Sequence, residues 1–236
     1  AATGQYETVP DPVSVQHRMT AVHRAVLDAG GPVLRFDQPV LADNSVSDIP
    51  VITNLFGTTE RVAAGLGVSI DKLDDLGEFL AALRSPTPPN GLRDAYSRWP
   101  MLKAALAARP KIVKSAPVHQ VVRKGRDVDM TSLPIQTHWP DDAGPLITWP
   151  VVVTRPFGSS AEDLDLYNAG VYRAQVLDRN TVIMRWLPHR GGAAHHKSWA
   201  EQGEKTPVAI VLGADPATLL SAALPLPETV SELSFA

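Results

Sequence analysis

Apolar residues in the first third of the chain switch between helical spacing and short strand-like runs. Residues 13–29 predict a helix that ends at Gly30-Gly31, because apolar side chains recur along one face. These apolar positions are Val15, Met19, Val22 and Val26. Residues 32–36 and 51–55 are rich in β-forming residues and predict two short strands.

Two more helices are expected after the second strand. Thr58 or Thr59 is a suitable N-cap for a helix that runs through Ala64 and ends near Gly67. Residues 70–84 carry one apolar stripe and predict a further helix. Strands and helices mixed in this way predict a small α/β layer.

The second half of the chain has the pattern of strands. Five β-like runs, separated by Pro, Gly and Asp, cover residues 117–122, 147–154, 166–176, 181–187 and 208–212. Little helix separates the first four runs, which predicts an antiparallel sheet or a partly closed barrel. Asp215 as N-cap and Pro216 at the first helical position predict a helix through Ala223.

A proline-rich segment marks the boundary between these halves. Residues 86–91 (PTPPNG) have the composition of a linker, and a short helix is expected over residues 102–108. The sequence therefore predicts an α+β fold of two domains, an α/β domain over residues 1–110 and a β domain over residues 111–236.

Composition narrows the functional classes. The 236 residues are 44% hydrophobic and 20% charged, which is ordinary for a globular protein with a real core. A net charge of -3 gives no basic surface to attract nucleic acid. No apolar run approaches the about 20 residues that span a bilayer. The absence of cysteine excludes disulfides and thiolate chemistry, so we expect a cytoplasmic protein.

Residues 167–196 concentrate the side chains with chemical potential. They predict two strands joined by the turn Asp178-Arg179-Asn180, followed by a glycine-containing loop. The cationic and ligand-type residues in this stretch include Asn168, Arg173, Arg185, His189, Arg190, His195 and His196. Such a density suits a site that holds a phosphate and a metal ion better than it suits a core.

Spacing alone leaves the roles of the strand residues open. Asn168 and Arg173 are five apart, so they share a face only if the strand bulges, which Gly170 permits. Otherwise they are a turn asparagine and a surface arginine. Arg185 lies among apolar neighbours, and it either binds a carboxylate or phosphate or reaches out to water.

The histidines allow more than one metal site. Gly191-Gly192 after His189-Arg190 either turns main-chain N–H groups towards an anion or forms a simple turn. His189, His195 and His196 are candidate zinc ligands, but adjacent histidines point apart, so we expect at most one of the three to bind metal.

A carboxylate near the end of the sequence offers a second type of metal site. Glu228 or Glu232, placed beside Asn168 and His189, would complete a set of amide oxygen, imidazole nitrogen and carboxylate oxygen. This set suits Mn²⁺ or Mg²⁺ better than Zn²⁺.

Several long blocks resemble the UbiD family of prenylated-flavin-dependent decarboxylases, particularly its 4-hydroxybenzoate branch. The blocks are ITNLFGTTERVAAGLG, LPIQTHWPDDAGPLITWPVVVTRP, NAGVYRAQ, IMRWLPHRGGAAHH, VLGADPATLL and PLPETVSELSFA. They follow one another from about Gly31 onward, and together they are more specific than any single motif above.

The resemblance implies a fold and a set of site residues. The second domain would be a flavin-reductase-like split β-barrel that holds prenylated FMN. The metal ligands would be Asn168, His189 and Glu232, binding Mn²⁺ with K⁺ nearby. The cofactor-contacting residues would be Val171, Tyr172, Arg173, Arg185, Trp186, Leu187, Arg190 and Gly191. Arg173 would also be the active-site arginine.

The implied reaction is the reversible, non-oxidative decarboxylation of an aromatic or α,β-unsaturated acid through a covalent substrate–cofactor adduct. The partners would be the acid, CO₂, a flavin prenyltransferase that supplies the cofactor, and other copies of the chain. In the family, the paired acids that include the proton donor lie downstream of the SELSFA block. We therefore expect these 236 residues alone to bind cofactor poorly and to turn over negligibly.

Two alternatives come from other functional classes. One is a flavin- and metal-binding module without catalysis. The other is a metal hydrolase that uses His189, His195 and His196, which no motif such as His-Glu-x-x-His supports.

Overall fold

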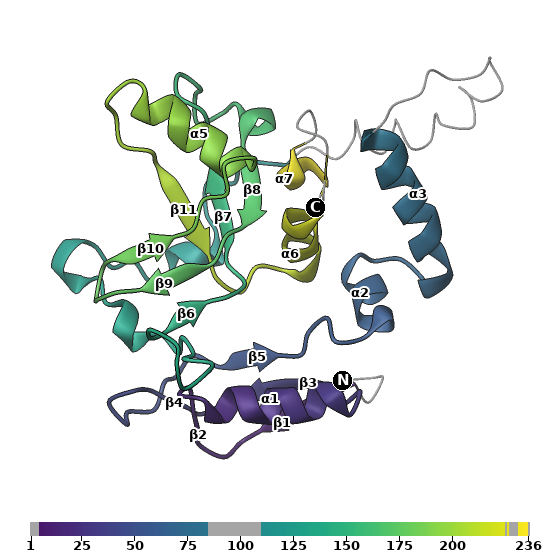
Figure 1. Ribbon diagram of the computed structural model, residues 1–236, viewed down its shortest axis with the longest axis vertical. Helices are drawn as coiled ribbons and strands as arrows, with labels where there is room; N and C mark the ends of the chain where they lie inside the picture. Colours follow the sequence, from purple (N-terminus) through teal and green to yellow (C-terminus); the bar gives the residue numbers. More distant parts are fainter. Residues whose placement is uncertain (1–4, 85–109, 225, 227–230, 236) are drawn as a thin grey trace. The chain divides into compact units, whose positions relative to one another are not determined.

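The computed structural model describes residues 5–84, 110–224, 226 and 231–235 (Figure 1). The chain forms two compact units, which are considered separately below. The first consists of Ala1–Val62, Ser115–Thr148 and Arg173–Arg185, and the second of Ala63–Lys114, Trp149–Tyr172 and Trp186–Ala236. Segments of the two units alternate along the sequence, so the units do not correspond to two consecutive domains. The division into two domains with a boundary near residue 110 stays a prediction.

The first unit contains the predicted α/β layer. Strands β1 (Tyr6–Val9) and β3 (Val33–Phe36) are parallel and are joined by helix α1 (Arg18–Asp28), while β5 (Val51–Thr53) lies antiparallel to β3. A second parallel pair is formed by β2 (Val13–Ser14) and β4 (Pro39–Val40). The buried residues of this core are Val13, Val15, Met19, Leu34, Phe36 and Leu41.

Helix α1 begins five residues later than predicted. Val13 and Ser14 pair with β4, and Val15 donates a main-chain hydrogen bond to Val40, so these residues are extended. His17 has a positive φ of 61° and precedes the first helical residue. The apolar period was correct, but pairing with β4 supplies main-chain hydrogen bonds that compete with a helical start.

The helices after β5 agree with the sequence. Helix α2 (Thr59–Gly65) is followed by Gly67 with a φ of 70°, and a 3₁₀ turn η1 (Ile70–Lys72) leads into α3 (Leu73–Arg84). The predicted linker over residues 86–91 and the predicted helix over residues 102–108 lie outside the described residues.

Two three-stranded antiparallel sheets follow. Strands β6 (Leu146–Ile147), β9 (Ala174–Val176) and β10 (Val182–Met184) form a sheet of the first unit in the order β10-β9-β6. Strands β7 (Val151–Thr154), β8 (Asn168–Val171) and β11 (Val208–Val211) form a sheet of the second unit in the order β11-β7-β8. The predicted antiparallel pairing is confirmed, and the described strands form no closed barrel.

Several predicted strands are shorter or absent. The run over residues 166–176 splits into β8 and β9, which belong to different sheets, and the run over residues 147–154 splits at Trp149-Pro150. The predicted strand over residues 117–122 is wrong, because residues Pro117–His119 form a 3₁₀ turn. The remaining 3₁₀ turns are Gly125–Asp127, Met130–Ser132 and Leu164–Leu166.

Three helices complete the second unit. Helix α5 (Gly191–Ala200) was not predicted, since Gly-Gly read as a loop. Helix α6 (Pro216–Ala223) begins as predicted, with the Asp215 carboxylate accepting from the N–H groups of Ala217 and Thr218. Helix α7 (Glu232–Phe235) packs against α6 and β8. None of the helices described is long and apolar enough to cross a membrane.

Candidate functional site

The first residue of β8, Asn168, is held closely by the start of helix α5. A Cβ atom added to Gly191 would overlap Asn168 Oδ1 and would lie 2.9 Å from its Cγ. Only glycine therefore allows the first turn of α5 to approach this amide. Asn168 Nδ2 is buried without a hydrogen-bond partner among the described residues. The Asn168 amide nitrogen is thus a buried hydrogen-bond donor without a partner among the described residues, next to the start of a helix.

Helix α7 brings a carboxylate to the same strand. Glu232 Oε2 accepts a hydrogen bond from the Ala169 N–H at 3.0 Å. The preceding Ser231 hydroxyl donates to the Tyr167 carbonyl at 3.3 Å. These bonds bracket Asn168 on both sides. Burial raises the pKa of Glu232, and the Ala169 N–H opposes that shift, so the ionised carboxylate is incompletely stabilised here.

The third predicted metal ligand lies next to this pair in the chain. His189 is exposed in the turn before α5, which the Arg190 N–H closes on the Leu187 carbonyl at 2.9 Å. His189 and Gly191 are two positions apart, so their Cα atoms are within about 7 Å. No described cluster of three His, Cys, Asp or Glu side chains could hold a metal. The predicted set has only two such side chains, and joint ligation by Asn168, His189 and Glu232 stays a prediction.

Residues have thus been brought together that fit a hard divalent cation. The Asn168 amide oxygen, packed where a Cβ on Gly191 would lie, and the largely buried Glu232 carboxylate are oxygen ligands of the kind that such an ion prefers. Glu228, the other candidate acid, lies outside the described residues.

An aromatic cluster supports the second glycine of the motif. The Tyr172 hydroxyl accepts from the Gly192 N–H at 3.0 Å, and the Tyr172 and Trp186 rings lie 5.0 Å apart. Trp186 also stacks on His196. A Cβ on Gly192 would overlap the Trp186 ring, so Gly192 is required for this packing.

The remaining two histidines are occupied elsewhere. His195 Nδ1 lies 3.0 Å from Thr154 Oγ1, and His196 Nδ1 lies 2.9 Å from Thr206 Oγ1. They point apart, as expected for neighbours in regular structure. With each imidazole engaged by a threonine, the hydrolase alternative gains no support from the geometry of the described residues.

In the first unit, Arg173 and Arg185 form a pair of opposed cations. Met184 faces Ala174 at the end of the β9–β10 ladder, and the Arg185 N–H donates to the Arg173 carbonyl at 3.4 Å. Directly opposed residues in an antiparallel pair project to one face. Both arginines are exposed, and no ion pair for either is seen among the described residues. Arg185 therefore reaches solvent, and two positive charges share one sheet face.

The path from Asn168 to Arg173 lacks the bulge that a shared strand face would need. No bulge forms at Gly170, which pairs directly with Val152 in the β7–β8 ladder. The strand instead ends at Val171, and Arg173 precedes the first residue of a strand in another sheet. Gly170 has a different role, since a Cβ there would lie 2.6 Å from the Tyr172 ring.

Family models decide which group this chain belongs to. The model described as the 3-octaprenyl-4-hydroxybenzoate carboxy-lyase Rift-related domain, UbiD, matches residues 111–236, more than half of the chain. The chain belongs to the UbiD family. The model of the UbiD N-terminal domain also matches residues 1–80.

Solved structures share the UbiD fold of this chain. Vanillic acid decarboxylase of Sedimentibacter hydroxybenzoicus in closed form is 22% identical, with a TM-score of 0.77 over 99% of this chain and 45% of that one. The UbiD-class enzyme HmfF of Pelotomaculum thermopropionicum in complex with FMN is 23% identical, with a TM-score of 0.68 over 99% and 45%. An evolved dimeric form of HmfF with prFMN is 24% identical, with a TM-score of 0.71 over 99% and 47%. This UbiD-family chain thus spans less than half the length of these structures.

Sequence reasoning missed Thr154, which the strand register places directly across from Asn168. It also missed helix α5, whose Gly191 lies against Asn168 and whose His195 contacts Thr154. Residues 191–200 lack a clear helical period of apolar side chains, and the two leading glycines indicated a loop.

Proposed function

We propose that this chain is the N-terminal and flavin-binding part of an enzyme that decarboxylates an aromatic or α,β-unsaturated carboxylic acid reversibly and without net oxidation. The observation that carries the proposal is the convergence of Asn168 and Glu232 at the start of β8, beside the glycine that opens α5. Family membership supports the reaction class.

The metal site of the proposal is built from Asn168, His189 and Glu232. The Asn168 amide oxygen and the Glu232 carboxylate would bind Mn²⁺ or Mg²⁺ as hard oxygen ligands, with His189 supplying the imidazole and K⁺ close by. Gly191 leaves room for the amide oxygen beside the start of α5 because it has no side chain. An ion here would also offset the unfavourable burial of the Glu232 charge.

The cofactor site of the proposal uses Val171, Tyr172, Arg173, Arg185, Trp186, Leu187, Arg190 and Gly191. Prenylated FMN, when bound, would supply the electron sink and the covalent link to the substrate. The protein's residues would bind and orient the cofactor and the substrate. Arg173 would hold the substrate carboxylate, and the exposed Arg185 and Arg190 would bind anionic cofactor oxygens.

The proposal extends to domains and partners. We assign residues 1–110 to an N-terminal α/β domain and residues 111–236 to a split β-barrel domain that binds prenylated FMN. A flavin prenyltransferase would supply the cofactor, and the enzyme would assemble from several copies. The cytoplasmic location stays a prediction.

Coproduction with a flavin prenyltransferase tests the proposal. We expect the purified chain to retain Mn²⁺ and some prenylated flavin, measured by metal analysis, absorbance and mass spectrometry. CO₂ release from aromatic acids is expected only when the remaining half of the family's fold is supplied. A chain that binds flavin but never supports CO₂ release in that assembly would favour the non-catalytic module. Absence of both flavin and Mn²⁺ would defeat the proposal.

A further inference from the structure

Helix α5 contacts the β7 strand and its continuation along a single face. Gly191, His195, Ser198 and Trp199 are spaced at one and two helical turns. His195 Nδ1 lies 3.0 Å from Thr154 Oγ1, and Ser198 Oγ accepts from the Phe157 N–H at 3.0 Å. Trp199 Nε1 donates to the Arg155 carbonyl at 2.8 Å. Three side-chain hydrogen bonds therefore fix how α5 is placed along this strand.

The contact closest to the proposed ion site is the one between His195 and Thr154. Thr154 lies directly opposite Asn168 in the β7–β8 ladder, so the two side chains project to the same face. Gly191 and His195 are one turn apart on α5, about 5.4 Å along its axis. Two neighbours on the helix thus meet two neighbours on the sheet, Gly191 on Asn168 and His195 on Thr154.

The Thr154 hydroxyl is the buried member of this arrangement. Thr154 is only 1% exposed, and His195 provides the side-chain partner for its hydroxyl. Burial lowers the pKa of His195, so its ring is neutral at pH 7 and keeps one acceptor and one donor nitrogen. Removing either group leaves a buried polar atom unsatisfied and frees the first turn of α5 to shift.

We propose that Thr154 and His195 are positioning residues for the divalent-ion site. Their hydrogen bond holds the start of α5 against Asn168, and Gly191 in turn fixes the direction in which the Asn168 amide oxygen points. Asn168 Nδ2 has no hydrogen-bond partner among the described residues, so packing against α5 is what orients the amide. This inference rests on the proposed function, because it assumes that Asn168 binds the ion.

The test measures binding of Mn²⁺ alone to the purified chain, from the electron paramagnetic resonance signal of the free ion. Thr154→Val and His195→Ala should each weaken Mn²⁺ binding about 10-fold or more, as is typical when a residue that orients a metal ligand is changed. The double variant should bind no more weakly than either single variant, because the two residues act through one bond. Thr154→Ser and His195→Asn, which keep a hydroxyl and a nitrogen at the bonding positions, should restore most of the affinity.

The matched controls are His196→Ala and Thr206→Val, which remove the neighbouring histidine–threonine bond. They should leave Mn²⁺ affinity unchanged. Wild-type affinity in folded His195→Ala would overturn the positioning role, and this variant remains informative if Thr154→Val fails to fold. Loss of binding in Asn168→Ala alongside that result would leave the proposed function standing. A wild-type chain that binds no Mn²⁺ would overturn both.

Discussion

The carboxylate of Glu232 accepts a hydrogen bond from the main-chain N–H of Ala169, at 3.0 Å and across 63 positions of sequence. This contact places an acid beside Asn168, the residue against which α5 begins. Two effects on the carboxylate oppose each other, because burial raises the pKa of Glu232 while the hydrogen bond lowers it. The metal-free protein therefore holds a carboxylate whose charge is costly.

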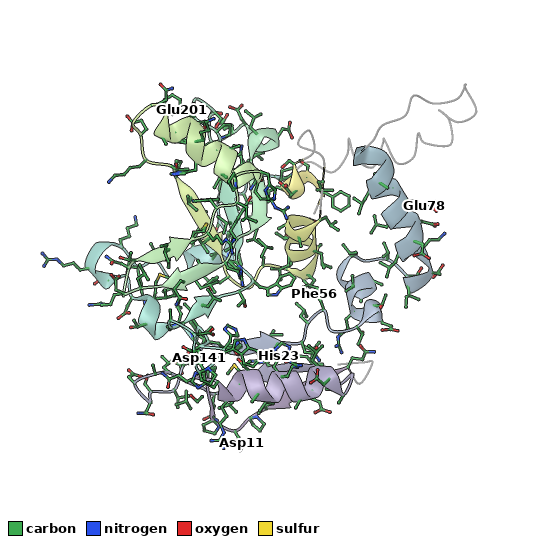
Figure 2. All side chains as sticks on the ribbon, viewed as in Figure 1. Asp11, His23, Phe56, Glu78, Asp141 and Glu201 are labelled. Atoms are coloured by element: carbon green, nitrogen blue, oxygen red, sulfur yellow. The ribbon has the colours of Figure 1, made fainter. Side chains whose placement is uncertain are left out.

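Glu232→Gln separates charge from hydrogen bonding. Glutamine keeps an oxygen for the Ala169 N–H, so the thermal unfolding temperature should stay at the wild-type value or rise. Mn²⁺ affinity should fall by more than the about 10-fold typical of outer-shell changes, because a charged ligand is lost. Glu201→Gln, at the end of α5 (Figure 2), is the control and should change neither quantity. Unchanged Mn²⁺ affinity in Glu232→Gln would remove Glu232 from the site.

The same substitution should have opposite effects at two glycines. Gly192→Ala would drive a Cβ into the Trp186 ring and against Tyr172, and such overpacking costs about 1–3 kcal/mol. Gly77→Ala adds a Cβ in open space on the exposed side of α3, which should stabilise the helix by up to about 1 kcal/mol. Chemical denaturation of both variants checks the sign. Equal effects at the two sites would contradict the close packing around Gly192.

The cap of helix α6 should be worth a measurable amount of stability. Asp215 accepts from the Ala217 and Thr218 N–H groups, and its pKa is lowered chiefly by the hydrogen bond from the Thr218 hydroxyl. Asp215→Ala should cost about 1 kcal/mol, or about 2–4 °C in Tm for a chain of this size. Asp215→Asn or Asp215→Ser should recover most of it. A Tm unchanged by the alanine variant would show that packing alone holds the helix.

The opposed arginines should weaken the free protein and strengthen anion binding. Like charges facing each other across strands cost about 0.2–1 kcal/mol, so Arg185→Gln should raise Tm slightly at low salt and less at high salt. The same variant should weaken FMN binding by about 10-fold, the loss expected for one charge-assisted hydrogen bond. Titration of FMN fluorescence, with Arg179→Gln as control, checks this. Stronger FMN binding by Arg185→Gln would contradict an anion-binding role.

Acidic pH should destabilise the first unit through two histidines. Burial lowers the pKa of both His23 and His138, and His23 lowers that of His138 further while Asp142 opposes the shift. A group that is harder to protonate when folded contributes stability above its unfolded pKa of about 6.5 and loses it as pH falls through the folded pKa. Tm should therefore drop on acidification below about 6.5.

His138→Gln should flatten this dependence, because it removes one of the two groups that must be protonated. His119→Gln, at an exposed position, is the control and should leave the pH profile as it is. A profile that is equally steep in His138→Gln would assign the acid sensitivity to other groups.

Local patterns predicted those elements that carry their own start and stop residues. Helix α6 follows from Asp215-Pro216, and α2 ends near Gly67 as expected. The start of α1 and the division of residues 166–176 were missed, since both depend on pairing with strands distant in sequence. Propensity cannot encode a partner strand, and it cannot show that one run of β-forming residues serves two sheets.

The sequence could name candidate residues for the site but could not give their geometry. Asn168 and Glu232 were named from residue type and family resemblance, but only the α7 contact brings the carboxylate to β8. The positions of Thr154 and His195 follow from the register of β7 with β8 and from α5, neither of which the spacing of single residues reveals.

Helix α7 has four residues, too few to be stable without tertiary contacts. Two side-chain hydrogen bonds tie it to the chain around β8, one at Glu232 and one at Ser231, the residue before the helix. If Glu232 binds an ion, docking of this short helix and occupancy by the ion are linked equilibria, and each must favour the other by the same factor. The affinity for the ion would then depend on how stably α7 is docked. Small changes at the Ser231–Tyr167 contact would therefore alter ion affinity although neither residue binds the ion.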